Sequence, residues 1–241
     1  MERYPNYLKI ASFNIQCAGY TKQWNEICEA IKKHDPDIIG IQECDVNTRR
    51  CGEGNQMEKL AKECGYPYWY FAATLENYQG GQYGHGIMSK YPITDSKVVF
   101  FDFQNGEVRN VERHEIDVNG KKLCFYNTHL ASSPEQYDEI QAMMDQDEYP
   151  ILVGDLNLKC NALIGHMDTD RYITLNGGPR LDTPIVTTIT MNAGYSCIDH
   201  IVLKKDKFDY HWNEDMGCGI FVNRPQPCSD HFMVYTYLKL K

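Results

Sequence analysis

The chain has 241 residues, of which 42% are hydrophobic and 24% are charged, and its formal net charge is −9. This length suits one large domain with a sizeable core. The acidic balance disfavours nucleic acid as a partner without excluding it, because the chain would have to bind a polyanion against its own field. No stretch approaches the roughly 20 apolar residues of a membrane-spanning helix, so we expect no transmembrane segment.

The cysteines and the N-terminus bear on the cellular compartment. Ten cysteines are scattered along the chain without a C-x-x-C sequence, whereas disulfide frameworks are typical of short secreted chains with denser cysteine. We therefore expect reduced thiols and no zinc site built from cysteine. The first residues lack the apolar stretch of a signal peptide. This favours a cytoplasmic protein, although a removed signal peptide would leave the same sequence.

Strands and helices alternate along the chain. In order, we expect a strand over residues 8–13, a helix around 24–31, a strand over 37–42, a helix over 57–64, a strand and turn over 87–93, a hairpin of 108–118 and 122–127, a helix from 133, and strands over 149–153, 197–203 and 232–240. Pro36 and Gly65 are typical helix stops. Asn119-Gly120 is a strong hairpin turn, and Ser133-Pro134-Glu135-Gln136 is a good capped helix start.

This order of elements indicates the fold class. Strands interspersed with a few helices and antiparallel hairpins are typical of a layered α/β sandwich with mixed sheets. The glycine-rich segment 80–86 leads into no helix, so we expect it to form a loop beside a site and not a nucleotide cradle. No linker or internal repeat is visible, and we expect residues 1–241 to form a single domain.

Several short segments place an acid, an amide or an imidazole where an apolar run ends. They are Ile41-Gln42-Glu43, Asn127-Thr128-His129, Gly154-Asp155-Leu156-Asn157 and Ser229-Asp230-His231, while Ile198-Asp199-His200-Ile201 lies inside such a run. Sheets fix the positions of groups at strand ends, which is a common way to build a site. Hydrolysis of a phosphoric ester needs neutralised phosphate oxygens, an activated water and a stabilised leaving oxygen. Together the segments predict metal-assisted attack of water on a phosphoric ester.

The oxygen-bearing side chains suit a hard cation. Mg²⁺ or Mn²⁺ binds carboxylate and amide oxygens, and one or two carboxylates commonly suffice. We expect Glu43 to bind the metal and Asn14 to hold the metal or its carboxylate. Asp155 and Asn157 lie two residues apart on a segment expected to be extended, so they should point the same way. Asp155 could then orient or deprotonate the water, and Asn157 could hold a phosphate oxygen.

The histidines have several candidate roles. His129 and His231 could donate to phosphate, or one of them could act as a general base. Asp199 needs a partner, because a buried carboxylate without one is costly. Its neighbour His200 should point to the opposite face of the strand, so we expect His231 to be the partner and His200 to pack structurally.

Taken in order, these segments resemble the endonuclease/exonuclease/phosphatase superfamily, the DNase I-like fold. The matching motifs are Ser12-Phe13-Asn14-Ile15, Ile41-Gln42-Glu43, Gly86-Ile87-Met88-Ser89-Lys90-Tyr91-Pro92-Ile93, Asn127-Thr128-His129-Leu130, Gly154-Asp155-Leu156-Asn157, Ile198-Asp199-His200-Ile201 and Ser229-Asp230-His231. They follow the order of the family within a resemblance that covers residues 8 to 238. The resemblance implies an α/β (α+β) fold, a four-layer sandwich of two packed mixed β-sheets flanked by helices. It also implies Mg²⁺ or Mn²⁺ as cofactor and phosphoester cleavage by activated water.

The resemblance assigns roles residue by residue. It implies metal-site roles for Asn14, Glu43 and Asp230, and catalytic roles for His129, Asp155, Asn157, Asp199 and His231. Arg50 lies in a Thr-x-Arg segment similar to one in bacterial members and could contact substrate, or it could be an ordinary surface arginine. His85 stands where members commonly have asparagine or glycine and is a second candidate substrate contact.

We therefore expect a divalent-metal-dependent phosphodiesterase-type hydrolase that acts on a small-molecule, nucleotide or lipid-headgroup phosphoester. A DNA or RNA nuclease with the same site is the alternative within this class. A non-catalytic binding protein on the same fold is the alternative from another class, and it would predict a broken site. Every expected acid, amide and histidine is present, which counts against it. No protein partner can be inferred from the sequence.

Overall fold

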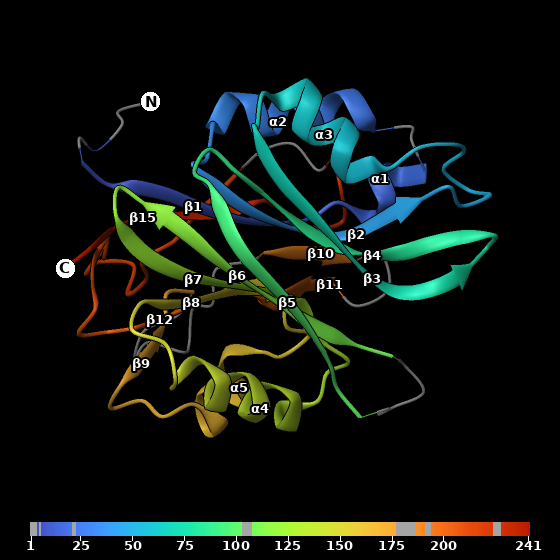
Figure 1. The fold of residues 1–241 in the computed structure, drawn as a ribbon. Helices are drawn as coiled ribbons and strands as arrows, with labels where there is room; N and C mark the ends of the chain where they lie inside the picture. The colour runs from blue at the N-terminus through green and yellow to red at the C-terminus, as the bar shows by residue number, and fades with distance from the viewer. Residues whose placement is uncertain are drawn as a thin grey trace.

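The computed structural model describes residues 4, 6–20, 23–102, 108–176, 187–190, 194–223 and 228–241. In this part of the chain, two mixed β-sheets pack face to face, and helices cover the outer side of each sheet (Figure 1). The arrangement confirms the predicted four-layer sandwich. None of the described helices is long and apolar enough to cross a membrane.

The first sheet carries the N-terminal half of the chain and its last strands. Its order is β13-β15-β1-β2-β4-β3, with β14 also paired to β15. The strands are β1 (Leu8–Asn14), β2 (Ile38–Val46), β3 (Tyr68–Tyr78), β4 (Gly81–Ser89), β13 (Phe208–Tyr210), β14 (Phe221–Val222) and β15 (Val234–Leu240). β1 runs parallel to β2 and antiparallel to β15. The helices α1 (Gln16–Tyr20), α2 (Trp24–His34) and α3 (Gln56–Cys64) lie on its outer face (Figure 1).

The second sheet carries the middle of the chain. Its order is β5-β6-β7-β8-β12-β9. The strands are β5 (Ile93–Phe100), β6 (Asn110–Val118), β7 (Lys121–His129), β8 (Pro150–Asp155), β9 (Tyr172–Thr174) and β12 (Asp199–Lys204). β7 and β8 are parallel, and β12 is antiparallel to β8. The helices α4 (Pro134–Met144) and α5 (Cys160–His166) cover its outer face, and β10 (Thr188–Thr190) pairs with β11 (Gly194–Ser196) in a separate ladder (Figure 1).

The central strands are buried on both faces, and alternate residues face different cores, which explains how the layers join. Ile10 of β1 and Phe125 of β7 belong to the core between the sheets, and both are fully buried. Phe13, three residues beyond Ile10, packs with the helices of the first sheet, and Tyr126 packs with those of the second. Burial of one such side chain contributes roughly 1.5–3 kcal/mol, so the shared core fixes one sheet on the other.

The predicted helices and the hairpin are present with small shifts of their ends. The hairpin turns at Asn119 (φ 55°) and Gly120 (φ 86°), as a turn of this kind requires. Ser133 does precede α4, but its hydroxyl donates to the Glu135 carboxylate instead of capping a backbone N–H. All ten cysteines lie in the described part of the chain as free thiols.

The glycine-rich segment is a strand and not the predicted loop, because its glycines serve close packing of strands. Residues 81–89 form β4, which lies between β2 and β3. A Cβ atom on Gly84 would collide with the carbonyl of Ala72, and one on Gly86 would collide with the carbonyl of Tyr70. Glycine therefore allows β3 to approach β4 closely at these positions.

Candidate active site

The strand ends of both sheets bring the predicted polar side chains to one end of the sandwich. His129 ends β7, Asp155 ends the neighbouring parallel strand β8, and Asp199 begins the antiparallel strand β12. The register places His129 opposite Asp155 and Asp199 opposite Asp155, so the three residues form one row across the sheet. On the facing sheet, Asn14 ends β1 and lies opposite Gln42 of β2.

Asp155 is the centre of this group. Its Oδ2 atom lies 3.0 Å from Nδ2 of Asn14, 3.4 Å from Nε2 of His231 and 3.5 Å from Nε2 of His129. Its side chain is almost completely buried. Burial raises the pKa of the Asp155 carboxyl to about 7, against the opposing effect of the His231 charge. A carboxyl group with a pKa near neutrality is suited to accept a proton at physiological pH.

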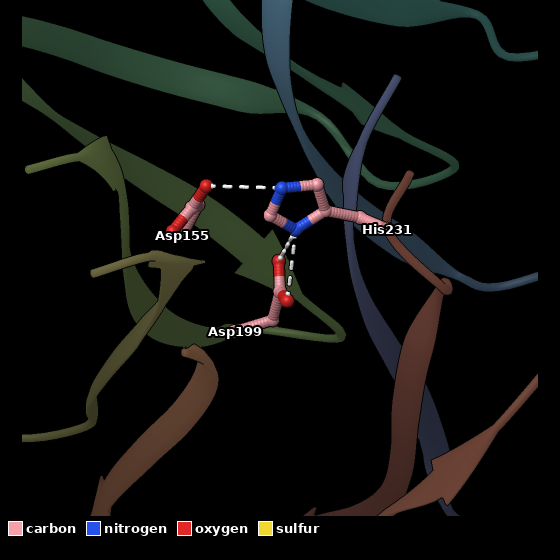
Figure 2. Close-up of side chains that lie close together, drawn as sticks. All are labelled: Asp155, Asp199 and His231. Atoms are coloured by element: carbon pink, nitrogen blue, oxygen red, sulfur yellow. Dashed lines mark hydrogen bonds and ion pairs between the residues drawn. The ribbon is translucent and has the colours of Figure 1, made fainter. Parts of the chain in front are cut away.

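His231 and Asp199 form the predicted pair. The Nδ1 atom of His231 lies 2.9 Å from both carboxylate oxygens of Asp199, and its other nitrogen faces Asp155 (Figure 2). Burial alone lowers the pKa of His231, but the carboxylates of Asp199, Asp155 and Asp230 outweigh it and raise that pKa to about 10. His231 is therefore an imidazolium at neutral pH, with a proton on each ring nitrogen.

His129 has the opposite character. The residue is 9% exposed, and burial lowers its pKa well below the ordinary value, with further lowering from the nearby charges of Arg109 and His231. His129 is therefore a neutral imidazole at neutral pH. Two imidazoles beside the same carboxylate thus differ in charge, because His231 has a carboxylate partner on each side.

Glu43 reaches the site through an irregularity in β2. The pairing of β2 with β4 shifts between Ile41 and Cys44, and Glu43 has a φ of 58°. Glu43 therefore lies at a bulge inside β2 and not at the strand end that the sequence suggested. Burial raises the pKa of the Glu43 carboxyl, while a hydrogen bond from Asn14 to Oε1 (3.0 Å) opposes the rise. A bound cation would compensate this partly buried carboxylate.

Asn14 links the two carboxylates. Its Nδ2 atom donates to Oε1 of Glu43 and to Oδ2 of Asp155, both at 3.0 Å, and its Oδ1 atom accepts the backbone N–H of Gln16 at 3.0 Å. The N–H of Gln16 fixes which end of the amide is oxygen. The amide oxygen is thus already engaged, and the geometry favours the second sequence expectation, in which Asn14 holds the carboxylate of the metal ligand.

Two sets of side chains compete as a place for a metal ion. Among the described residues, Asp155, Asp199 and His231 bring their ligand atoms within 4.8 Å of one another. Within this set, Nδ1 of His231 already bonds both carboxylate oxygens of Asp199. Glu43 and Asp230 offer carboxylate oxygens, which a hard cation prefers, and the Asp230 charge contributes to the raised pKa of Glu43. These donors fit the expected Mg²⁺ or Mn²⁺.

Asn157 lies next to the site, but the expectation that it points the same way as Asp155 from an extended segment was wrong. β8 ends at Asp155, and Asn157 has a φ of 50°, so the segment between them is not extended. The backbone N–H of Asn157 donates to Oδ1 of Asp155 at 3.0 Å, and its side-chain amide donates to the carbonyl of Leu130 at 2.9 Å. These contacts hold Asp155 and leave Asn157 beside it.

Arg50 and His85, the predicted substrate contacts, lie next to the cluster, since Cys17 Sγ is 2.7 Å from Arg50 and 3.9 Å from Glu43 and the charge of His85 acts on His129. The guanidinium of Arg50 bonds both carboxylate oxygens of Asp45, at 2.6 and 2.9 Å, and lies over the rings of Tyr78 and Tyr83. His85 lies on β4 and is only 2% exposed, so it is below the surface. Burial lowers the pKa of His85.

Two residues near the site carried no signal in the sequence. The hydroxyl of Thr188 donates to Oδ2 of Asp199 at 2.8 Å and lies 3.2 Å from Nδ1 of His231. The charge of Arg109 acts on Glu43 and His129, which places it beside the same cluster. Each is a single common residue outside the recognised motifs, so only the fold reveals them. A hollow of about 530 Å³ next to Tyr7 and Asp37 lies at the other end of the strands, away from this cluster.

The chain is similar to known proteins in sequence and in fold. Residues 11–231 match the sequence model of the Endonuclease/Exonuclease/phosphatase family. No curated protein matches the chain. A solved endonuclease/exonuclease/phosphatase from Beutenbergia cavernae shares 19% identity at a TM-score of 0.73, over 98% of this chain and 72% of that one.

Two further solved structures illustrate the breadth of this fold. D. rerio TDP2 complexed with a single-strand DNA product shares 15% identity at a TM-score of 0.71, over 97% of this chain and 99% of that one. The mannosyl-6-phosphatase Bt3783 of Bacteroides thetaiotaomicron shares 17% identity at a TM-score of 0.65, over 96% and 99%. At such identities the likeness shows the fold alone.

Proposed function

Because the chain belongs to the endonuclease/exonuclease/phosphatase family, we propose that it is a divalent-metal-dependent hydrolase of phosphoric esters. More specifically, we propose a phosphodiesterase, in which water attacks phosphorus in a small-molecule, nucleotide or lipid-headgroup ester. The observation that supports this most is the row of His129, Asp155 and Asp199 across neighbouring strands, with His231 between the two carboxylates.

Asp155 would activate the water. Its carboxylate accepts hydrogen bonds from Asn14 and from the backbone of Asn157, which fix its orientation. A pKa of about 7 makes it a competent proton acceptor near neutral pH. A water molecule held against Asp155 loses its proton to the carboxylate as its oxygen approaches phosphorus.

The histidines would stabilise the charge that develops on phosphate. His231 is an imidazolium whose Nδ1–H is used by Asp199, which leaves Nε2–H directed toward the site. His129 is a neutral donor next to the same carboxylate. Preorganised donors of this kind, in a site that excludes water, are commonly the largest contribution to rate enhancement.

Glu43 and Asp230 would hold the metal, with Asn14 orienting Glu43. When bound, the cation supplies positive charge that neutralises the non-bridging oxygens and stabilises the leaving oxygen. We take Mg²⁺ or Mn²⁺ as the metal because the donors are hard oxygen atoms. The free thiols of the chain support a reducing compartment, the cytoplasm, as its location.

A nuclease is the second candidate, because the fold is shared with a TDP2 complexed with single-strand DNA. The net charge of −9 counts against a long nucleic acid substrate. A small or short ester avoids this repulsion, which is why we favour it.

A panel of substrates tests the proposal. Single-stranded DNA, RNA, a cyclic dinucleotide, sphingomyelin and a sugar-phosphate monoester would each be incubated with Mg²⁺, Mn²⁺ or EDTA, with the His231→Ala variant as the blank. Metal-dependent cleavage of one class that is lost in the variant would support the mechanism and name the substrate class. Cleavage that persists in EDTA, or that His231→Ala retains, would refute it. Metal binding without any cleavage would favour the non-catalytic reading.

A further inference from the structure

The bulge in β2 needs a cause outside β2 itself. Ile41 pairs with Gly86 and Cys44 pairs with Gly84. Gln42 and Glu43 of β2 therefore together oppose one residue of β4, His85. This is the arrangement of a β-bulge, which re-aims a side chain. Glu43 adopts a φ of 58°, a region that residues other than glycine rarely occupy. Such a conformation persists only where the surroundings over-determine it.

Asn127 of β7, in the opposite sheet, contacts the bulge at the point where the regular pairing ends. Its Oδ1 atom accepts the side-chain amide of Gln42 at 2.6 Å. Its Nδ2 atom donates to the carbonyl of Gly86 at 2.9 Å and lies 3.3 Å from the carbonyl of Ile41. Ile41 and Gly86 are the last regular pair before the bulge. Asn127 therefore contacts the backbone of both β2 and β4 where their regular pairing ends.

Asn127 and Gln42 each have a further hydrogen-bond partner. Asn127 donates to Oε1 of Glu112 at 2.6 Å, and Gln42 donates to the hydroxyl of Ser12 at 3.1 Å. Ser12, Gln42, Glu112 and Asn127 are all fully buried. A Cβ atom on residue 40 would meet the Asn127 side chain, so Gly40 gives the amide the space it occupies. The second oxygen of Glu112, Oε2, lies 3.1 Å from Nε2 of His114. Buried polar networks rigidify their surroundings to the extent that their members are paired.

We propose that Gln42 and Asn127, the amide pair, are positioning residues that hold Glu43 in its metal-binding orientation and align it with the catalytic residues of the facing sheet. Asn127 lies on the same strand as His129, two residues before it, and therefore on the same face. Asn127 thus contacts the bulge that carries Glu43 and belongs to the strand that carries His129. The inference rests on the proposed function, since it assumes that Glu43 binds the metal.

The test is Mn²⁺ binding to the intact protein with Gln42→Met, which keeps the length of the side chain and removes its hydrogen bonds. Free Mn²⁺ would be followed by electron paramagnetic resonance. Removal of a residue that orients a metal ligand typically weakens metal affinity 10–100-fold, so we expect the Kd for Mn²⁺ to rise by about 10-fold or more. At saturating Mn²⁺ the KM for substrate should change by less than about twofold, since the amide pair touches no substrate.

Two further variants keep the outcome interpretable. Thr236→Val removes one hydrogen bond from an equally buried residue of β15, whose hydroxyl donates to the carbonyl of Gly219 at 2.7 Å, and should leave Mn²⁺ affinity unchanged. Ser12→Ala removes only the hydroxyl beside Gln42 and serves if Gln42→Met does not fold; we expect a severalfold weaker affinity. Wild-type affinity in a folded Gln42→Met or Ser12→Ala variant, or equal weakening in Thr236→Val, would overturn the proposal. Failure of the wild type itself to bind Mn²⁺ would instead overturn the proposed metal site.

Discussion

Replacing Asp199 by asparagine should lower the pKa of His231 and slow turnover. The carboxylate of Asp199 accepts the Nδ1–H of His231 with both oxygens at 2.9 Å, so the change removes a charge-assisted hydrogen bond. Such a bond contributes about 1.5–3 kcal/mol, and one pKa unit corresponds to about 1.4 kcal/mol. The pKa of His231, raised to about 10 against the effect of burial, should therefore fall by roughly one to two units.

The same change should reduce kcat by about 10²–10⁴-fold, because the imidazole loses the group that orients it. The ring nitrogens of His231 would be titrated by nuclear magnetic resonance, and kcat would be measured at neutral pH with saturating metal. Thr188→Val is a useful companion, since it removes the hydroxyl that bonds Asp199 but keeps the charge, and its effect should be smaller. An Asp199→Asn variant with unchanged pKa and unchanged kcat would show that the pair does not act in catalysis.

Other parts of the structure give further predictions. Glu43→Ala should weaken Mn²⁺ binding, measured by calorimetry, by about 10-fold or more; an unchanged metal requirement would remove Glu43 from the site. Arg50→Met should lower the free energy of unfolding by about 3 kcal/mol, because the fully buried Asp45 loses its cationic partner and keeps only the neutral donors Thr48 and Cys51; a raised KM at native stability would instead identify Arg50 as a substrate contact. Burial lowers the pKa of His200 from 6.5 to about 4, so its protonation in the unfolded chain should cost about 3 kcal/mol of stability as pH falls from 6.5 to 4. In urea unfolding this loss should be absent from His200→Gln, and equal pH slopes would refute it. Dithiothreitol should leave Tm unchanged, since the cysteines are free thiols; a large fall would reveal a structural disulfide.

The elements that the sequence predicted include helices whose buried residues fall at helical spacing and central strands that are buried along nearly their whole length. Ile27 and Ile31 on α2 fall at helical spacing, and both are fully buried against the first sheet. β3 escaped prediction because it is an edge strand, and its exposure changes without regular alternation along Tyr68–Tyr78. The glycines of β4 looked like a loop because a sequence does not show that a neighbouring strand needs the space.

The candidate site follows the same logic. The pairing of Asp199 with His231 could be predicted, because a carboxylate inside an apolar strand requires a partner. His200 is excluded as that partner because adjacent residues of a strand point to opposite faces. The backbone of Glu43 could not be predicted, since its positive φ depends on Asn127, which comes from the other sheet. Arg50 shows the remaining difficulty: its role depends on Asp45, and the sequence does not show whether they meet.

The most direct test of metal-dependent phosphodiester hydrolysis is the cleavage of a simple diester, bis(p-nitrophenyl) phosphate, with Mn²⁺ and with EDTA. We expect release of p-nitrophenol by the wild type only with metal, and a loss of at least about 10²-fold in Asp155→Asn and His231→Ala variants that remain folded. Release that is insensitive to EDTA, or that survives in both variants, would contradict it. So would a wild type that binds Mn²⁺ and cleaves neither this diester nor any member of the substrate panel.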